Sequence, residues 1–382
     1  MKGFFPINKF KEVTTPFYYY DTSILQKTID TIKGIVAKHP NYYVHYAIKA
    51  NANSKVLAYI SKAELGADCV SGGEIQAALN AGFPVDKIVF AGVGKSDEEI
   101  KLGLEHGIFC FNVESEEELE VINQLAKEKG VTAHIAFRIN PNVGAHTHAN
   151  ITTGLSENKF GINMEDMERI IARALAMGNI ALEGLHFHIG SQILIMDDFT
   201  ALCNRINELQ DKLDITLKHI NVGGGLGIDY DNPNEHLIPD FESYFETFHS
   251  HLELREGQTL HFELGRSIVG QCGSLISKVL YVKQGSSKKF AILDAGMTDL
   301  IRPALYQAHH SIENLTSDEA EEEYDVVGPI CESSDVFDKA VILNKVKRGD
   351  YFALRSAGAY GEIMASGYNC RPLPKGYLDT EF

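Results

Sequence analysis

Hydrophobic and polar positions alternate in two rhythms along most of the chain. From residue 42 onward, short apolar stretches rich in β-branched and aromatic residues are separated by longer stretches with apolar residues every three or four positions. The first pattern is typical of strands and the second of amphipathic helices. Eight strands are predicted in this way, over 42–49, 67–70, 87–91, 108–112, 133–139, 183–189, 218–223 and 259–264.

The helical stretches carry their own start and stop signals. In segment 115–130, Ser115 is placed to cap the first turn, Glu118 follows three residues later and a glycine ends the pattern. Segment 96–107 repeats this order, with acidic residues first and His106 before its final glycine. Eight consecutive strand–helix units predict a TIM-like (β/α)8 barrel. An open doubly wound sheet is the alternative, but it rarely contains eight consecutive parallel units.

After the eighth unit the alternation stops, and the remaining chain reads as short strands between Gly, Ser and Asp turns. We therefore expect an α/β plus all-β chain, in which residues 27–264 form the barrel and residues 1–26 and 265–382 form a C-terminal β-domain, a sandwich or small barrel. The strand-like segment 15–21 precedes the barrel and is expected to pair into that β-domain. The acidic stretch 317–325 is expected to be a solvated loop.

Composition narrows the possible partners. The 382 residues are 44% hydrophobic and carry a net charge of −17, which argues against general binding to nucleic acid or anionic membrane. There is no apolar stretch of membrane-spanning length, and the first ten residues lack the apolar region of a secretory signal. The cysteines have no C-x-x-C spacing, so reduced thiols and a cytoplasmic location are expected. They are Cys69, Cys110, Cys203, Cys272, Cys331 and Cys370.

Reactive residue types fall where a barrel places its chemistry. Active sites of these barrels lie at the carboxyl ends of the strands, and phosphate tends to lie on the loops after strands seven and eight. The predicted strand ends carry Lys49, Asp68 with "SGGE" (71–74), Arg138, "HFHIGS" (186–191), "GGGLG" (223–227) and "FELGRS" (262–267). This convergence predicts an active site at the mouth of the barrel.

The glycine run and the lysine together suggest a particular kind of cofactor. Consecutive glycines after a strand let backbone N–H groups surround an anion, although a plain tight loop is the alternative. Gly265 and Arg266 follow the next predicted strand, at the same end of the barrel, and together with the glycine run they favour a phosphate-anchored cofactor. An amine in a partly dry barrel, such as that of Lys49, becomes a nucleophile towards an aldehyde. Pyridoxal phosphate is a phosphorylated aldehyde that acts as an electron sink.

Two further side chains, those of Glu263 and His188, suit that cofactor. Glu263 is placed to keep a pyridine nitrogen protonated, and His188 to lie flat against the ring, although a lone strand histidine is more often a hydrogen-bonded core residue.

A candidate metal site is the segment "HTH" (146–148), which could suggest a metal pair. It lies in a long polar loop, 141–161, without a carboxylate at ligand spacing, so no metal is expected. The length and polarity of this loop invite the hypothesis that it closes over substrate, which the sequence does not decide.

Taken together, the motifs resemble a known family. The segments are "YAIKANAN", "GGEI", "GLHFHIGSQI", "NVGGGLGIDY", "ELGRSIVG", "RPALY", "GPICESSD" and "GAYG". This set is similar to the fold-type III pyridoxal-phosphate decarboxylases, over residues 15 to 375, and most similar to members that act on meso-diaminopimelate. The resemblance implies an alanine racemase/ornithine decarboxylase-like barrel and β-domain. It also implies a homodimer with active sites shared between the two subunits.

The resemblance also implies roles for individual residues. Lys49 would form the Schiff base with pyridoxal phosphate, His188 would stack on its ring and Glu263 would pair with its nitrogen. The phosphate would be surrounded by Ser191, Gly225, Arg266, Tyr360 and the backbone of Leu264 and Gly265, where many relatives have proline in place of Leu264. The substrate would be held by Arg266, Arg302, Tyr306, Glu332 and Tyr360. Cys331 would be the catalytic acid, supplied with Glu332 by the partner subunit, while Asp68 and Arg138 match positions near the cofactor without a firm role.

The expected reaction is decarboxylation of meso-diaminopimelate to L-lysine and carbon dioxide, the last step of lysine synthesis. The substrate α-amine would displace Lys49, and Cys331 would protonate the α-carbon, because a thiol pKa of about 8.5 lies close to working pH. Ornithine lacks the distal carboxylate, so it would leave Arg266 and Arg302 unpaired. Without the resemblance, Arg302 would be read as a surface salt bridge and Tyr306 as a core aromatic.

Three other functions remain open at this point. One is decarboxylation of carboxynorspermidine or another basic amino acid on the same fold. An alanine racemase also combines a barrel and a β-domain, but a glutamate at the ring nitrogen, as in Glu263, opposes it. A non-catalytic homologue that only carries the cofactor belongs to a different class. It should have lost Lys49 or Cys331, and both are present.

Overall fold

A computed structural model describes residues 5–144 and 159–382, and the chain divides into two compact units. The first unit contains residues 29–227 and 240–265. The second contains 228–239, 266–382 and the described residues before Ile29. Segment 228–239, which we assigned to the barrel from the sequence, therefore groups with the second unit. Within the described residues, no helix is long and apolar enough to cross a membrane.

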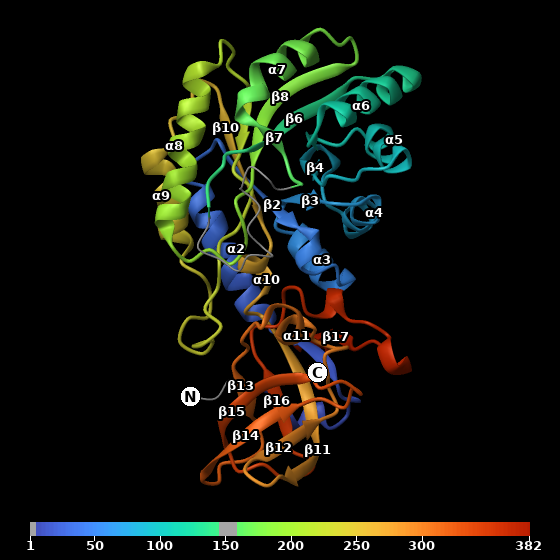
Figure 1. Ribbon diagram of the computed structural model, residues 1–382, viewed down its shortest axis with the longest axis vertical. Helices are drawn as coiled ribbons and strands as arrows, with labels where there is room; N and C mark the ends of the chain where they lie inside the picture. Colours follow the sequence, from blue (N-terminus) through green and yellow to red (C-terminus); the bar gives the residue numbers. More distant parts are fainter. Residues whose placement is uncertain (1–4, 145–158) are drawn as a thin grey trace. The chain divides into compact units, whose positions relative to one another are not determined.

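The first unit is a closed barrel of eight parallel strands (Figure 1). The strands are β2 (Tyr42–Ala47), β3 (Gly66–Cys69), β4 (Ile88–Phe90), β5 (Cys110–Val113), β6 (Ala133–Asn140), β8 (Ile180–Phe187), β9 (His219–Asn221) and β10 (Thr259–Leu264). Pairing of β5 with β6 closes the ring, and a short strand, β7 (Ile162–Asn163), is added to β6. The predicted barrel is confirmed, and closure excludes the open doubly wound sheet.

Helices lie on the outside of the barrel (Figure 1). They are α2 (Thr22–Val36), α3 (Ser54–Ser61), α4 (Gly72–Ala81), α5 (Asp97–His106), α6 (Glu116–Lys129), α7 (Met167–Leu175), α8 (Met196–Lys212) and α9 (Phe241–His251). α2 precedes β2, and each of the others follows a barrel strand. The predicted caps are present: the Ser115 side chain accepts from the Glu118 amide, and Ser96 forms a reciprocal capping box with Glu99.

Two strands, β2 and β8, end about two residues earlier than the sequence predicted, and this affects two candidate site residues. β2 stops at Ala47, and Ile48–Ala50 form a 3-10 turn, so Lys49 lies in a turn and not in the strand. The Tyr46 hydroxyl donates to the Asn51 carbonyl at 2.9 Å and helps to hold this turn. β8 stops at Phe187, so His188 is the first residue of the following loop.

The second unit is built on an eight-stranded sheet. Its strands are β1 (Phe17–Tyr20), β11 (Gly273–Gln284), β12 (Lys289–Leu293), β13 (Ile312–Asn314), β14 (Glu321–Val327), β15 (Val336–Asn344), β16 (Tyr351–Leu354) and β17 (Lys375–Leu378). Short helices are α1 (Ile7–Phe10), α10 (Arg266–Val269) and α11 (Arg302–Tyr306). β1 pairs antiparallel with β11 and parallel with β17, which confirms the expected pairing of segment 15–21.

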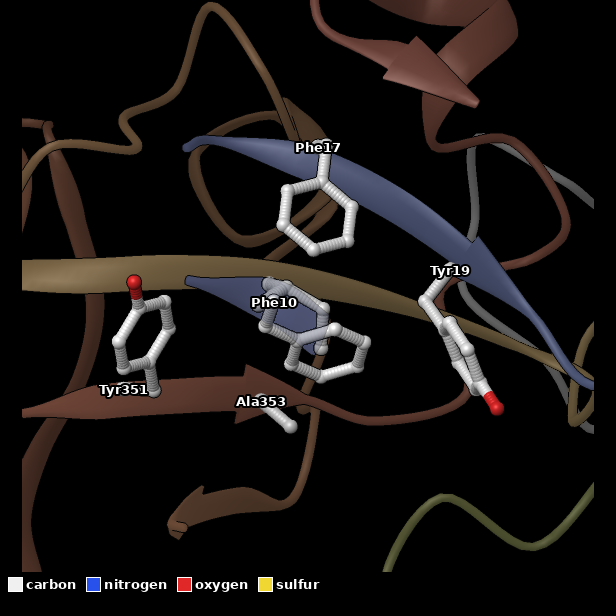
Figure 2. Packing of buried hydrophobic residues seen from close by; sticks show 6 residues of the cluster. Phe10, Phe17, Tyr19, Tyr351 and Ala353 are labelled. Atoms are coloured by element: carbon white, nitrogen blue, oxygen red, sulfur yellow. The ribbon is translucent and has the colours of Figure 1, made fainter. Parts of the chain in front are cut away.

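Aromatic side chains form a core on this sheet (Figure 2). Phe10 packs edge-on against Phe17 and Tyr19, with ring centroids 5.2 and 5.3 Å apart. Tyr351 and Ala353 of β16 belong to the same buried cluster. The segment before the barrel is therefore an integral part of this unit.

The acidic stretch 317–325 is only partly the solvated loop that we expected. Glu321–Val327 form β14, which pairs with β15. Charge does not prevent strand formation here, because the first glutamates lie at the exposed end of the strand. Glu322 pairs with Lys289 of β12 at 2.6 Å, and Tyr324 is buried.

Candidate active site

Lys49 meets a buried carboxylate at the mouth of the barrel. Its Nζ donates to Oδ2 of Asp68, the third residue of β3, at 2.9 Å. The lysine side chain is 36% exposed, whereas that of Asp68 is fully buried. Burial, followed by the charge of Glu263, raises the pKa of Asp68, and Lys49 acts against that rise. The amine is thus oriented and still reachable from solvent.

Glu263 of β10 is held inside the barrel by three side chains from other strands. Its Oε1 accepts from Nδ2 of Asn112 at 3.0 Å and of Asn221 at 2.7 Å, and its Oε2 accepts from Nε2 of His186 at 2.9 Å. All four side chains are buried. β5, which carries Asn112, lies four strands away from β10 in the ring, so this contact crosses the interior.

These contacts also set the charge of the carboxylate. Burial on its own raises the pKa of Glu263, but the charge and hydrogen bond of His186 and the charge of Lys49 outweigh it and hold that pKa below its usual range. A carboxylate offers about four acceptor positions, and the three donors leave one on Oε2. Glu263 can therefore receive one further N–H while ionised.

Two loops at the carboxyl ends of β8 and β9 are tied together. The Ile193 amide donates to the Gly225 carbonyl at 2.8 Å, and the Gly227 amide donates back to Ile193 at 2.9 Å. This pairing brings the loop that carries Ser191 against the glycine run. A Cβ on Gly224 would lie 2.0 Å from the Glu263 carbonyl oxygen, so only glycine fits.

Gly265 brings the end of β10 against the turn that carries the lysine. A Cβ added to Gly265 would lie 3.0 Å from Cβ of Ala50 and 3.1 Å from Cβ of Ala47. Leu264, the last residue of β10, is fully buried. The close approach explains why small residues flank Lys49 on both sides.

His188 is a neutral ring at the same mouth. Burial, with the charges of Arg138 and Lys49 following, lowers its pKa well below the usual value. The Gly224 amide donates to His188 Nδ1 at 3.3 Å, so the ring proton is on Nε2.

Arg138 donates to Glu114 at 2.8 Å, and Glu114 also accepts from the amides of Gly92 and Gly161. Glu114, paired with Arg138, therefore ties two loops of the mouth together.

The residues of the mouth fit pyridoxal phosphate. A reachable amine lies on Lys49, and an ionised Glu263 has one acceptor position left for a ring N–H. Asp68 Oδ1 is buried without a hydrogen-bond partner among the described residues, so it can accept from a polar group that enters the mouth. A flat neutral imidazole and a glycine-rich backbone complete a set of groups that suits a phosphorylated aromatic aldehyde.

In the second unit, Tyr230 lies close to two buried arginines. Arg266 Nη1 donates to the Tyr230 hydroxyl at 2.5 Å, and its guanidinium carbon lies 4.8 Å from the ring centre of Tyr360. The guanidinium carbon of Arg302 lies 4.8 Å from the ring centre of Tyr230. Tyr306, at the end of α11, is near enough to raise the pKa of Arg266.

Arg302 does not form the surface salt bridge that would be expected for it without the family resemblance. It is buried, and its Nη1 donates to Nε2 of the neutral His310 ring at 2.8 Å. His310 Nδ1 donates to the Arg355 carbonyl at 2.8 Å, which leaves Nε2 as the acceptor. Burial and the charge of Arg302 lower the pKa of His310 to about 3. Within residues 5–144 and 159–382 no carboxylate pairs with Arg302, so this buried cation calls for an anion from outside.

Cys331 and Glu332 are exposed on the loop between β14 and β15. The Cys331 amide donates to Asn369 Oδ1 at 3.3 Å, and Glu332 accepts from the Tyr368 hydroxyl at 2.8 Å. Four of the six cysteines are buried, and Cys370 is exposed like Cys331. Two reactive side chains are thus held in place on an open surface.

The predicted residues lie in three groups: those around Lys49 and Glu263, the two arginines with their tyrosines, and Cys331 with Glu332. The structure adds other residues that the sequence did not reveal. Tyr230, His310, His186, Asn112 and Asn221 were missed, although "HFHIGS" contained His186 and "NVGGGLG" contained Asn221. Among the described residues, no group of three or more His, Cys, Asp or Glu side chains is arranged to hold a metal ion. The "HTH" segment and most of loop 141–161 lie outside the described residues.

Comparison with known proteins agrees with this geometry. Residues 25–270 match the family described as pyridoxal-dependent decarboxylase, pyridoxal binding domain. A diaminopimelate decarboxylase of Bacteroides thetaiotaomicron is 72% identical over the full length of both chains. A crystal structure of diaminopimelate decarboxylase from Helicobacter pylori, complexed with L-lysine, is 40% identical with a TM-score of 0.90, covering 97% of this chain and 93% of that one. A second such complex, from M. jannaschii, is 37% identical with a TM-score of 0.87, covering 98% and 89%.

Proposed function

From the premise that the chain belongs to the pyridoxal-dependent decarboxylases and uses pyridoxal 5′-phosphate, we propose that it converts meso-diaminopimelate to L-lysine and carbon dioxide. The observation that supports this substrate is the burial of Arg302 against the neutral rings of His310 and Tyr230, because a buried cation in such surroundings requires an anion. The relatives named as diaminopimelate decarboxylases, and their complexes with L-lysine, support the same substrate.

When bound, pyridoxal phosphate supplies an electron sink for the electrons that a leaving carboxylate releases. Lys49 would hold the cofactor covalently through its amine. Ionised Glu263 would receive the ring N–H, and His188 would provide a flat neutral face. The phosphate would be surrounded by Ser191, Gly225, the backbone of Leu264 and Gly265, Arg266 and Tyr360. Cys331 donates the proton that the α-carbon receives after carbon dioxide has left.

Substrate choice rests on the distal end of the amino acid. Arg302, with Arg266, Tyr306 and Tyr360, binds the distal carboxylate, and Glu332 binds the distal ammonium. Ornithine has the ammonium but not the carboxylate, so it leaves the arginine charge uncompensated. Leaving one partner of a buried charge pair alone costs about 2–5 kcal/mol, which corresponds to a preference of roughly 30-fold or more.

The functional unit is a homodimer in a cytoplasmic setting. Exposure of both Cys331 and Glu332 in the single chain supports this, because a proton donor and a substrate ligand are of no use in open solvent. Each subunit gives these two residues to the other's active site. Reduced cysteines agree with the cytoplasm.

The test is product formation by the purified, cofactor-loaded protein. Lysine and carbon dioxide are measured with meso-diaminopimelate, ornithine and carboxynorspermidine at equal concentrations, and the Arg302→Met variant runs beside the wild type. Lysine from diaminopimelate alone, with a large rise in KM in the variant, is the expected result. Turnover of carboxynorspermidine without lysine release would replace the proposed substrate while keeping the reaction class.

A further inference from the structure

A second cavity opens at the opposite end of the barrel from Lys49. Its volume is about 660 Å³, and it is lined by residues from the amino ends of the strands. Tyr43 is the second residue of β2, His134 the second of β6, His219 the first of β9 and Thr259 the first of β10. Because the strands are parallel, their amino ends gather on the face away from the catalytic mouth. None of the roles assigned above uses this cavity.

Flat rings with nearly parallel planes line the cavity. The Tyr43 and His261 rings are 5.0 Å apart with planes 19° from parallel, and the Phe109 and His261 rings are 5.3 Å apart at 13°. Tyr43 is 42% exposed and Phe109 is half-buried, so both present surface to an incoming molecule. A planar ring can extend such an array by offset stacking, whereas a bulky aliphatic group cannot.

The buried histidines of the cavity form a directed chain of hydrogen bonds. His45 Nδ1 donates to the Lys87 carbonyl at 3.0 Å, so its Nε2 accepts from His261 Nδ1 at 2.8 Å. His261 Nε2 then accepts from the Thr259 hydroxyl at 2.9 Å. Burial lowers the pKa of His45 and of His261, and it lowers that of His219 to about 4. The floor of the cavity is therefore uncharged at neutral pH.

Charges at the rim balance one another. Glu183 accepts from His134 at 2.8 Å and pairs with Lys218 at 2.7 Å. Asp86 and Lys87 add one charge of each sign. A ligand with a strong net charge would gain little here, while an uncharged one with a polar edge finds donors and acceptors.

We propose that this cavity is a second small-molecule site, which binds a neutral, flat heteroaromatic compound up to about the size of a nucleoside. The cavity falls in the range of about 300–1,000 Å³ typical of ligand pockets, and its lining combines rings with a few polar groups. This inference does not depend on the reaction at the catalytic mouth. It is a statement about binding at the other end of the barrel.

Indole is the probe for the test, because the chain contains no tryptophan and indole emission then arises from the probe alone. The cofactor-loaded protein is titrated, and the emission shift gives a dissociation constant. We expect saturable binding to the wild type and at least fivefold weaker binding to Tyr43→Ala. Tyr281→Ala removes a similarly exposed ring from β11 and should bind as the wild type does.

Two results would overturn the proposal. One is equal indole affinity in Tyr43→Ala and the wild type, or no saturable binding at all. The other is displacement of indole by saturating L-lysine, which would place the probe at the catalytic mouth. Phe109→Ala serves as a second variant, with unfolding midpoints recorded for all proteins. If it does not fold, Tyr43→Ala decides alone, because that side chain is largely exposed.

Discussion

At the scale of single residues, Glu263 is held from three sides by donors, and its ionisation follows from that arrangement. Glu263→Gln keeps the size of the side chain but cannot keep a ring nitrogen protonated. We expect kcat to fall by about 100-fold or more, as for loss of other preorganised electrostatic groups. Steady-state kinetics measures this, with Glu183→Gln as a control at the other end of the barrel. Equal losses in both variants would contradict the role of Glu263.

His310 positions Arg302 without contacting a reacting atom. His310→Leu removes the acceptor at 2.8 Å, so the guanidinium loses its fixed orientation. We expect KM for meso-diaminopimelate to rise about tenfold, since one hydrogen bond to a charged group contributes about 1.5–3 kcal/mol, while kcat changes little. His310→Gln, which retains an acceptor, should recover part of the loss. A fall in kcat with unchanged KM would rule out this positioning role.

His310 also makes stability depend on pH. Its pKa is about 3 in the folded chain and about 6.5 when unfolded, so below pH 6.5 the unfolded chain takes up a proton that the folded chain does not. The free energy of unfolding should therefore fall as pH decreases, by about 2 kcal/mol between pH 6.5 and 5 from this group alone. Urea unfolding of the wild type and His310→Gln measures it as a difference in slope. Parallel pH profiles would refute it.

The sequence revealed those residues that stand next to a recognisable local signal. Lys49 and Glu263 could be predicted because each lies at the end of a strand that the hydrophobic pattern predicts. Asn112 and His310 could not, because an asparagine in a strand or a histidine in a loop has no characteristic spacing. Their partners lie 151 and 8 positions away along the chain, and only the folded structure brings them together.

At the scale of elements, the glycine run after β9 is fixed by its contact with β10. A Cβ on Gly224 would lie 2.0 Å from the Glu263 carbonyl oxygen, a backbone atom that cannot rotate away. Gly224→Ala should lower the free energy of unfolding by about 1–3 kcal/mol and weaken cofactor binding. Gly178→Ala, where a Cβ has open space, should stay within about 0.5 kcal/mol of the wild type in denaturant titration. Equal stabilities of the two variants would contradict the contact.

Element types were easier to predict than element ends. Eight strands and their helices follow from periodicity, but β2 and β8 each stop about two residues before the predicted end. The 3-10 turn at Ile48–Ala50 lies where Gly265 approaches Ala47 and Ala50, a contact between distant segments that no local pattern reveals. The acidic start of β14 is a similar case, because pairing with β15 overrides the preference of charged residues for loops.

At the scale of the whole molecule, the proposed dimer can be tested by mixing two inactive variants. Lys49→Ala and Cys331→Ala should each lose activity. If each active site takes Lys49 from one subunit and Cys331 from the other, a mixed dimer regains one intact site. Random mixing after mild dissociation should then restore about a quarter of wild-type activity, since half of the dimers are mixed and half of their sites are intact. Complete absence of recovery, with mixed dimers demonstrated, would refute the shared site.

The boundary between the two units of the chain is only partly predictable from the sequence pattern. The change from alternating units to short strands near residue 265 marks the second unit well. Segment 228–239 groups with the second unit, where Tyr230 contacts Arg266, and no change in composition along the chain predicts this. The sequence pattern likewise does not predict which surface the proposed second subunit would cover.

The central claim is that Lys49 is the residue that bonds the cofactor, and one measurement tests it most directly. The purified protein, loaded with pyridoxal phosphate, is reduced with borohydride, digested and mapped by mass spectrometry, with Lys55→Ala as a control for a neighbouring surface lysine. We expect a pyridoxyl group on Lys49 in the wild type and the control, together with lysine release from meso-diaminopimelate before reduction. A pyridoxyl group on another lysine, or decarboxylation that survives Lys49→Ala, would contradict it.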